Sequence, residues 1–536
     1  MSNPFLSAIE KLSTFSRRDL FRTGGLLSLP AFLRPPASAS TLKLGKGIYE
    51  SIGVKPVINC RGTFTIIGGS LELPEVREAK EQAADHFVHL DELMDAIGVR
   101  LAELTGAESG IVTSGCAAGL SHATAACVAG GNPDLHVRIP NLTGFPRDEV
   151  IIPKHSRNVY DASVRAVGVK IVEARTLEEF EAAMGPRTAM VYIYAGPAAE
   201  TGPLAFDVVS RVSRERNVPV LVDAAAEVIT VPNVHLQRGA TLVGYSGGKC
   251  LRGPQCAGVL IGRKDLIKAA WIHSAPHHGY GRSMKVGKEE AIGMLMAVEM
   301  WAKRDHEAEW KNWLSAMDQI GKRLSPIEGV TAQIRESKGL SNRTPGIDIR
   351  WDSDKLGITG AEVARVLFTT EPRISLNAIG GRRGSPATGE TGVSVTAYMM
   401  SPGEEKIVAD RLHTILSAKR SPKPKAAPVP PAADLSGRWD VAIEYASGTS
   451  QHALHLHQNG SQVAGTHQGD FVSRDLSGSI SGGKVRLASS YTEESGDNLQ
   501  YEFTGSLTAD GMSGTLEMGE YRSAKWTAKK HRSRVI

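Results

Sequence analysis

Short apolar runs recur between residues 105 and 265 of this chain and alternate with stretches of helical periodicity. Two examples are Val218–Val222 and Thr241–Tyr245, which contain few polar positions. Continuous apolar runs of this length are typical of parallel strands that are buried on both faces. The pattern therefore predicts an α/β fold with a doubly wound sheet, with strands near residues 111, 151, 171, 191, 220, 242 and 259.

Helical periodicity dominates on either side of this region. Pro74 begins a predicted helix whose apolar side chains, spaced three and four residues apart, form one stripe. The stripe consists of Phe87, Leu90, Met94, Ile97, Leu101 and Leu104. A second helical pattern runs from Glu289 to Leu324 and leads into a smaller α+β unit. Capping boxes at Thr359–Glu362 and Ser401–Glu404 predict two helix starts in that unit.

The pattern changes after the proline-rich segment Ser421–Pro431, which predicts a stiff, extended linker. Beyond it, apolar and polar residues alternate with period two in runs such as Ala453–His457 and Lys484–Leu487. This alternation predicts an antiparallel β-barrel or sandwich, loosely similar to lipocalin-like modules. Such a module would bind a ligand, a wall component or another chain, or would only enlarge the enzyme.

The N-terminal segment predicts export. Ser16–Arg22 contains the pair Arg17-Arg18 and precedes a mild apolar run, Gly24–Leu33, followed by the small residues Ala37–Ala39. This order resembles a twin-arginine signal with a cleavage site. The run is much shorter than the ~20 apolar residues that span a bilayer, so no permanent membrane anchor is expected. We therefore expect a periplasmic or otherwise exported protein.

Five segments follow from these patterns. They are a signal (1–39), a large domain with its N-terminal segment (45–290), a small α+β domain (291–418), a linker (419–434) and a β-barrel-like domain (435–532).

Charge and cysteine content argue against a nucleic-acid-binding protein and against a zinc site. The 62 basic and 57 acidic residues give a net charge of only +5, without the dense basic blocks of a nucleic-acid-binding protein. The five cysteines lack the paired spacings of a zinc site, so no metal is expected. An odd number leaves at least one thiol unpaired, although a Cys116 disulfide to Cys250 or Cys256 remains an alternative.

Two residues with ionisable side chains, an aspartate and a lysine, lie at or just after the ends of neighbouring predicted strands. Asp223 ends the run Leu221–Asp223, and Lys249 ends Ser246–Lys249 just after the next run. Open α/β sheets bind their ligands at the carboxyl ends of strands. A buried acid and a Ser-x-x-Lys in this order resemble the way in which enzymes of the aspartate-aminotransferase fold type hold pyridoxal 5'-phosphate (PLP). Lys249 would form the Schiff base, and Asp223 would keep the pyridine nitrogen protonated.

The phosphate of this cofactor has a predicted binding loop upstream. An apolar stub runs into Ser114 and Gly115 and then, from Cys116, into an alanine-rich helical stretch. Because the first N–H groups of a helix have no partner within it, they would bind the phosphate together with Ser114 and Ser246. His155, which follows the run Val150–Ile152, occupies the place of the aromatic ring that usually covers the cofactor in this fold type.

Residues from about 50 to 415 resemble the selenocysteine synthase (SelA)-like family of PLP-dependent, fold type I enzymes, and especially its branch similar to D-glucosaminate-6-phosphate ammonia-lyase. The matching segments are Val57–Thr63, Gly106–Glu108, Thr113–Gly115, Ser246–Lys249, Gly253–Gln255 and Gly281–Glu290. The resemblance implies a large doubly wound domain, a small α+β domain, PLP as cofactor, and a homodimer or higher homo-oligomer.

The resemblance also implies a reaction. Lys249, released when an amino-acid substrate takes its place on PLP, would remove the Cα proton, and loss of a Cβ group would give a 2-oxo acid and ammonia. The expected function is thus a PLP-dependent lyase acting on a hydroxylated or aminosugar-derived amino acid. Two alternatives are a selenium transferase acting on L-seryl-tRNA(Sec) and an exported binding protein that uses the β domain.

Substrate-binding residues are predicted less directly. Arg373 stands in the small domain, where this fold type often binds the substrate carboxylate, and a planar guanidinium suits that task. Arg282 and Lys285 lie in a stretch that resembles a subunit-contact segment of the family, and Arg282 would reach a neighbouring active site.

Overall fold

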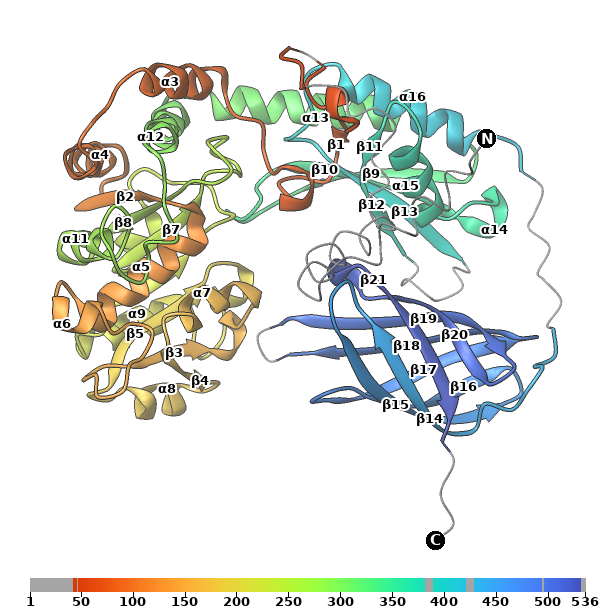
Figure 1. Cartoon of the computed structure of the whole chain (residues 1–536). Coiled ribbons are helices and arrows are strands. Elements are labelled where there is room, and N and C mark those ends of the chain that lie inside the picture. The colour runs from red at the N-terminus through yellow and green to blue at the C-terminus, as the bar shows by residue number, and fades with distance from the viewer. Residues whose placement is uncertain (1–41, 46, 381–388, 421–428, 494–495, 532–536) are drawn as a thin grey trace, which may run out of the picture. The chain divides into compact units, whose positions relative to one another are not determined.

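The computed structural model describes residues 42–45, 47–380, 389–420, 429–493 and 496–531 (Figure 1). The predicted export signal at 1–39 and most of the predicted proline-rich linker lie outside the described residues. None of the described helices is both long and apolar enough to cross a membrane.

A seven-stranded sheet contains all of the strands predicted between residues 105 and 265, in the order β2-β8-β7-β6-β5-β3-β4. The strands are β2 (Ser109–Thr113), β3 (Glu149–Pro153), β4 (Lys170–Ala174), β5 (Thr188–Tyr194), β6 (Val220–Asp223), β7 (Leu242–Ser246) and β8 (Gly258–Gly262). The strands from β7 to β4 are paired in parallel, whereas β8 runs antiparallel to both of its neighbours. The α/β prediction is thereby confirmed.

Helices alternate with these strands along the chain (Figure 1). They are α5 (Gly115–Ala129), α6 (Pro133–His136), α7 (Ala162–Arg165), α8 (Leu177–Ala183), α9 (Phe206–Glu215), α10 (Val234–Gln237) and α11 (Lys264–Ile272), with the short 3-10 helices η3 (Lys154–Ser156), η4 (Val159–Asp161) and η5 (Pro197–Ala199). Helix α5 is buried along nearly its whole length and packs against β7 and β8. The alanine-rich sequence of α5 permits this close approach.

The helix predicted from Pro74 to Leu104 is two helices. They are α3 (Pro74–Ala84) and α4 (Leu90–Thr105), and Phe87 lies between them with a fully exposed side chain. The predicted stripe therefore begins at Leu90 rather than at Phe87. Acidic Asp91 and Glu92 lie in the first turn of α4, where they interact favourably with the helix dipole.

The helical pattern from Glu289 to Leu324 is also interrupted, giving α12 (Lys288–Lys303) and α13 (His306–Leu324). Asp305 ends the first pattern because its side chain accepts a hydrogen bond of 2.9 Å from the N–H of Ala308 and so caps α13. Apolar spacing alone does not reveal such a break.

A four-stranded antiparallel sheet follows, in the order β12-β13-β10-β9. Its strands are β9 (Val330–Glu336), β10 (Pro345–Asp352), β12 (Asn377–Ile379) and β13 (Glu390–Thr396), and its helices are α14 (Ser353–Leu356), α15 (Gly360–Thr369) and α16 (Glu404–Leu416). The capping box at Thr359 is confirmed by hydrogen bonds in both directions with Glu362. The one at Ser401 is confirmed only in part: the carboxylate of Glu404 binds the N–H of Ser401, but α16 begins at Glu404 and its N-cap is Gly403.

A separate compact unit comprises the described part of Met1–Ile58 together with Arg365–Ser375. It contains the short helix η1 (Glu50–Ile52), the first residue of β1 (Ile58–Asn59) and β11 (Ile374–Ser375), the strand that pairs with β1. The 3-10 helix η2 (Thr65–Ile67) follows β1 along the chain.

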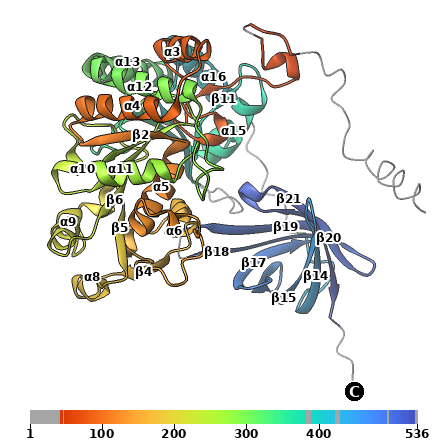
Figure 2. The same cartoon turned by 60° about the vertical axis from the view of Figure 1, so that its left-hand side comes forward.

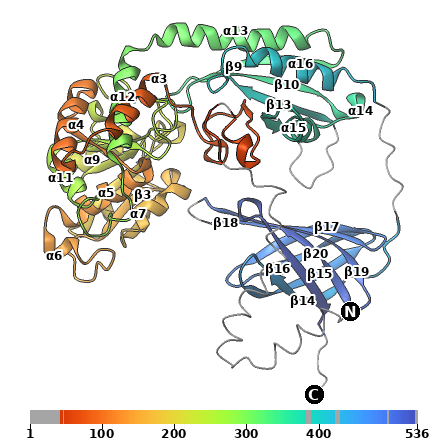
Figure 3. The same ribbon diagram turned by 45° about the horizontal axis from the view of Figure 1, so that its top comes forward.

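Eight antiparallel strands close into a barrel in the C-terminal part of the chain (Figure 2, Figure 3). They are β14 (Gly437–Glu444), β15 (Thr449–Asn459), β16 (Gln462–Gln468), β17 (Ser473–Ser481), β18 (Lys484–Thr492), β19 (Asn498–Thr508), β20 (Gly511–Glu517) and β21 (Ser523–Lys530), with η6 (Gly519–Tyr521) before β21. Pairing of β21 with β14 completes the ring, so the predicted β domain is a barrel and not a sandwich. Its period-two pattern places residues such as Trp526 and Phe503 inside.

Candidate active site

Asp223 and Lys249 lie at the carboxyl ends of adjacent parallel strands. Asp223 is the last residue of β6 and is 2% exposed, and Lys249 follows the end of β7. The register pairs Asp223 with Gly244, so the two strand ends lie side by side. Burial raises the pKa of Asp223, while the N–H of Ala225, the hydroxyl of Tyr192 and the charge of the Lys249 amine act in the opposite direction. The structure thus brings the predicted acid and lysine together.

Three donors face the carboxylate of Asp223. The hydroxyl of Tyr192 donates to Oδ2 at 2.9 Å, the N–H of Ala225 donates to Oδ1 at 3.1 Å, and the thiol of Cys116 lies 3.7 Å from Oδ1. Burial raises the pKa of both Tyr192 and Cys116 well above the usual values, so both groups keep their protons and donate them. Strands β5 and β6 and helix α5 therefore converge on one buried carboxylate.

The start of helix α5 has the properties of an anion-binding site. Ser114 is its N-cap residue, but the Ser114 side chain makes no capping hydrogen bond. Gly115 has a φ of +80°, a conformation that glycine adopts without strain. Gly258 allows β8 to approach this turn, because a Cβ atom there would lie 2.5 Å from the backbone N of Cys116. The first N–H groups of α5 are consequently free of side-chain caps.

His155 lies in η3, directly after β3, and its ring is fixed by two hydrogen bonds. Nε2 lies 3.0 Å from the carbonyl oxygen of Leu204, and Nδ1 lies 3.1 Å from the hydroxyl of Ser156. Because a carbonyl only accepts, the proton is on Nε2 and Nδ1 accepts from Ser156. Further along the same loop, Asn158 donates to the hydroxyl of Tyr192 at 3.2 Å, which ties the loop to Asp223.

Known proteins with related sequences include an ammonia lyase, a monooxygenase-decarboxylase and selenium transferases, although no family model matches this sequence. D-glucosaminate-6-phosphate ammonia lyase of Salmonella typhimurium is 30% identical over 325 residues, which cover 59% of this chain and 85% of that protein. The 5'-C-glycyluridine monooxygenase-decarboxylase of a Streptomyces species is 32% identical over 384 residues, 69% of this chain and 92% of that protein. The chain belongs to the SelA-like family of PLP-dependent fold type I enzymes.

A solved structure and a further relative agree with this assignment. The structure of a D-glucosaminate-6-phosphate ammonia-lyase has a TM-score of 0.61 and 28% identity, and covers 70% of this chain and 99% of that chain. The L-seryl-tRNA(Sec) selenium transferase of Proteus mirabilis is 27% identical over 284 residues, 47% of this chain and 57% of that protein.

The residues present fit PLP. The buried Asp223 suits a cationic partner, which a protonated pyridine nitrogen supplies, and the amine of Lys249 lies close enough to influence its pKa. The start of α5 offers uncapped N–H groups to the phosphate. The part-exposed Ser246 follows at the end of β7, and neither it nor Ser114 uses its hydroxyl in a hydrogen bond within the described part of the chain. These residues would hold the cofactor, with His155 as the predicted stacking ring.

The predicted substrate-binding arginines differ in their environment. In the separate compact unit, the side chain of Arg373 donates to the carbonyl oxygens of Phe368 and Lys55 at 2.9 and 2.8 Å and lies 4.4 Å over the Phe368 ring. Those bonds hold that unit together, and the carboxylate-binding role of Arg373 stays a prediction. Arg282 and Lys285 are exposed in the loop before α12.

Sequence reasoning missed Tyr192 and Asn158. Tyr192 faces Asp223 from β5, in a strand that is otherwise almost wholly apolar. Because a buried hydroxyl needs a hydrogen-bond partner, the tyrosine in this strand, which is buried on both faces, was the sequence signal for a polar contact. The alternative of a Cys116 disulfide is wrong, because all five cysteines are free; Cys116 instead faces Asp223, and Cys250 lies 3.2 Å from the carbonyl oxygen of Glu227.

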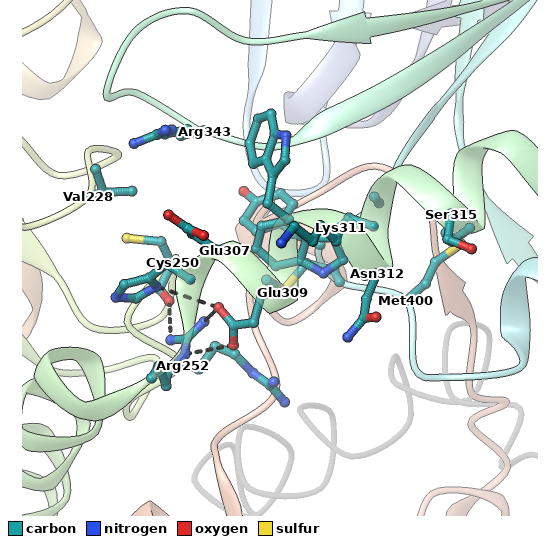
Figure 4. A pocket seen from close by; sticks show the side chains of 18 of the residues that line it. Val228, Cys250, Arg252, Glu307, Glu309, Lys311, Asn312, Ser315, Arg343 and Met400 are labelled. Atoms are coloured by element: carbon teal, nitrogen blue, oxygen red, sulfur yellow. Dashed lines mark hydrogen bonds and ion pairs between the residues drawn. The ribbon is translucent and has the colours of Figure 1, made fainter.

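A cavity of about 870 Å³ borders Cys250, the residue after Lys249 (Figure 4). Its wall includes Arg304, which binds the carboxylate of Glu309 through two nitrogens and donates to the carbonyl oxygen of Cys250 at 3.1 Å. Neither Lys249 nor Asp223 lines this cavity. The walls of this cavity therefore contact the segment that carries Lys249.

Proposed function

We propose that this protein is an ammonia-lyase that acts on a hydroxylated or aminosugar-derived amino acid and releases a 2-oxo acid and ammonia. The observation that carries the proposal is the buried Asp223 with its three donors beside the amine of Lys249. The relative named as an ammonia lyase supports the reaction type, since the alignment covers 85% of its length.

The proposed reaction assigns one task to each residue. PLP, when bound, withdraws electrons from the Cα atom of the substrate. Asp223 holds the proton on the pyridine nitrogen, and Tyr192 and Cys116 keep its carboxylate oriented. The Lys249 amine takes the Cα proton and delivers a proton to the departing Cβ oxygen, so that water leaves. Hydrolysis of the resulting enamine consumes one water and gives the 2-oxo acid and ammonia.

The test uses the purified chain loaded with PLP. We expect a visible absorption band that borohydride abolishes, with a reduced cofactor recovered by mass spectrometry on the peptide that contains Lys249. Assays for 2-oxo acid and ammonia on hydroxylated and aminosugar-derived amino acids should show activity in the wild type and in the control Lys268→Ala, an exposed lysine of α11, but not in Lys249→Ala. Labelling of another lysine, or equal activity in Lys249→Ala, would refute the assignment.

The selenium transferase alternative has weaker support, because the Proteus mirabilis relative is 27% identical over 57% of its length, against 30% over 85% for the ammonia lyase. Tight binding of seryl-tRNA by the mature chain, without 2-oxo acid production, would favour it over the lyase. The third alternative, an exported binding protein without catalysis, predicts no reducible cofactor at Lys249.

We also propose that the chain forms a homodimer or higher homo-oligomer through the loop that carries Arg282 and Lys285. Both side chains are exposed and make no hydrogen bond or ion pair within the described residues. Light scattering of the wild type should give a multiple of the 57.3 kDa chain mass, less any cleaved signal. The double variant Arg282→Ala/Lys285→Ala should dissociate at lower ionic strength than the wild type, and a monomeric wild type would end this proposal.

Export through the twin-arginine route is the last part of the proposal, and it rests on the sequence of residues 1–39. Because that route carries folded proteins, it suits an enzyme that takes up PLP in the cytoplasm. Replacing Arg17 and Arg18 by lysine should leave the protein in the cytoplasmic fraction at full length. Equal export of the lysine variant would contradict the proposal.

A further inference from the structure

The inside of the C-terminal barrel is apolar except near one end. Most inward positions carry residues such as Leu454, Leu476, Phe503 and Trp526. Near the end formed by the β14–β15, β16–β17 and β18–β19 loops, the inward positions are polar. They are occupied by Tyr445, His452, His467, Arg474, Ser489 and Tyr501. The mouths of β-barrels are common places for small-molecule sites.

Arg474 is the charged residue of this polar end. It is paired with His467 across β16 and β17, points inward and is only 7% exposed. Its Nε and Nη1 atoms are buried and have no hydrogen-bond partner among the described residues. A guanidinium keeps its charge at any ordinary pH, and a buried charge without a partner costs several kcal/mol. No carboxylate of a described residue forms an ion pair with Arg474.

The polar neighbours of Arg474 that the structure describes do not supply an anion. His452 Nδ1 lies 2.8 Å from His467 Nε2, and His467 Nδ1 lies 2.7 Å from the hydroxyl of Ser489. Burial lowers the pKa of His467 to about 3 and also lowers that of His452, so both rings are neutral at pH 7. The carboxylate of Asp470 lies 3.5 Å from Nε2 of His452 and is half exposed.

The space around the guanidinium restricts how an anion approaches. The ring of Tyr501 lies 4.7 Å from the guanidinium carbon of Arg474 and covers one of its faces. Gly469 lies against Nη1, where a Cβ atom would come within 2.6 Å, so glycine leaves room for the charged group. An anion would therefore meet the guanidinium at its edge, in the plane that matches a carboxylate.

We propose that this end of the barrel binds a small organic molecule through a carboxylate held by Arg474. A single buried cation balances a single negative charge, which favours a carboxylate over a phosphate carrying nearly two charges. The chain of hydroxyls and rings from Tyr445 through Ser450 to His452, with contacts of 2.8 and 3.0 Å, supplies neutral hydrogen-bonding groups beside the site. The binding does not depend on the proposed lyase reaction.

The test measures binding of sodium acetate and sodium hexanoate to the full PLP-loaded chain by ligand-observed NMR at constant ionic strength. We expect saturable binding, weakened about tenfold or more in Arg474→Gln because a charge-assisted hydrogen bond is lost. The control Arg486→Gln changes an exposed arginine of β18 in the same barrel and should bind like the wild type. Equal binding in Arg474→Gln, or no saturable binding to the wild type, would overturn the proposal.

Thermal unfolding distinguishes a ligand site from an internal ion pair. Acetate should raise the unfolding midpoint of the wild type more than chloride does at equal concentration, and should not do so in Arg474→Gln. Asp470→Asn should keep or strengthen acetate binding, because it removes a nearby negative charge. If Asp470 were instead the partner of Arg474, Asp470→Asn would destabilise the barrel as much as Arg474→Gln, and the proposal would fail. Should Arg474→Gln not fold, Arg474→Lys keeps the charge without the planar fork and should also weaken binding.

Discussion

The hydroxyl of Tyr192 donates a hydrogen bond of 2.9 Å to Oδ2 of Asp223, from one strand to the neighbouring parallel strand. This bond joins the N–H of Ala225 and the thiol of Cys116 on the same carboxylate. Burial raises the pKa of Asp223, and the bond from Tyr192 opposes that effect. Tyr192 therefore helps to keep a buried carboxylate ionised where the cofactor needs a negative charge.

Replacing Tyr192 by phenylalanine should weaken the enzyme without unfolding it. The pKa of Asp223 should rise further, and the loss of a hydrogen bond to a charged group, about 1.5–3 kcal/mol, should lower kcat/KM roughly 10- to 100-fold. Steady-state kinetics with PLP in excess would measure this effect. Tyr194→Phe is the matched control, since Tyr194 is half-buried on the same strand. Similar losses in both variants would show that Tyr192 acts only through packing.

Replacing Asp223 by asparagine tests the electronic role directly. The amide is close in size but carries no charge, so it cannot hold the pyridine nitrogen in its protonated form. We expect kcat to fall about 1,000-fold or more, equivalent to about 4 kcal/mol of barrier, while some PLP remains bound. Reconstitution with a cofactor analogue methylated at the pyridine nitrogen, which is permanently cationic, should restore part of the activity. Failure of that rescue, with the analogue bound, would point to a structural role for Asp223.

Replacing Gly258 by alanine tests the anion-binding turn. The added Cβ would lie 2.5 Å from the backbone N of Cys116 and 2.6 Å from the carbonyl carbon of Gly115, so the start of α5 must shift. We expect PLP affinity, measured by equilibrium dialysis, to fall at least about tenfold, because the N–H groups leave the positions that suit the phosphate. Gly131→Ala is the control, since its Cβ would make only an ordinary contact of 3.7 Å with Ile272. Unchanged affinity in Gly258→Ala would exclude this turn as the phosphate site.

The sequence was sufficient to predict the central sheet and the placement of Asp223 and Lys249 at adjacent strand ends. Both follow from one physical constraint: parallel strands buried on both faces are apolar along their whole length, and their carboxyl ends meet at one edge. Asp223 stands out because it ends such a run, and Lys249 stands out because it closes the Ser-x-x-Lys segment after the next run. The barrel was predictable for a similar reason, since Trp526 and Phe503 occupy alternate, inward positions of their strands.

These sequence patterns do not predict which helices and strands contact one another. The bond from Tyr192 to Asp223 depends on which strands are neighbours, and the order β7-β6-β5 is not encoded in any one segment. The break at Asp305 depends on a capping bond from the N–H of Ala308, which apolar spacing does not encode. Arg474 interrupts the alternation of β17 as one polar residue at an inward position, which a pattern of apolar positions does not register.

A buried histidine in α5 should make the chain sensitive to acid. His122 is fully buried, both of its ring nitrogens lack hydrogen-bond partners, and burial, with a smaller effect of His273, lowers its pKa to about 4. The unfolded value is about 6.5, so the unfolded chain binds the proton more readily. The neutral ring therefore contributes its full stability above about pH 6.5, and this contribution is lost as the pH falls toward 4.

His122→Leu should remove this dependence, because leucine loses no hydrogen bond at the site and takes up no proton. At pH 7.5 the free energy of unfolding of the variant, measured with urea, should lie within about 1 kcal/mol of the wild-type value. At pH 5 the difference between the two should shift by about 1–2 kcal/mol in favour of the variant. The exposed His86→Leu serves as the control and should show no such gain. The prediction fails if the difference in unfolding free energy between His122→Leu and the wild type is the same at both pH values. The His122 ring would then already carry a proton in the folded chain. A protonated ring requires an acceptor, which the described residues around His122 do not provide.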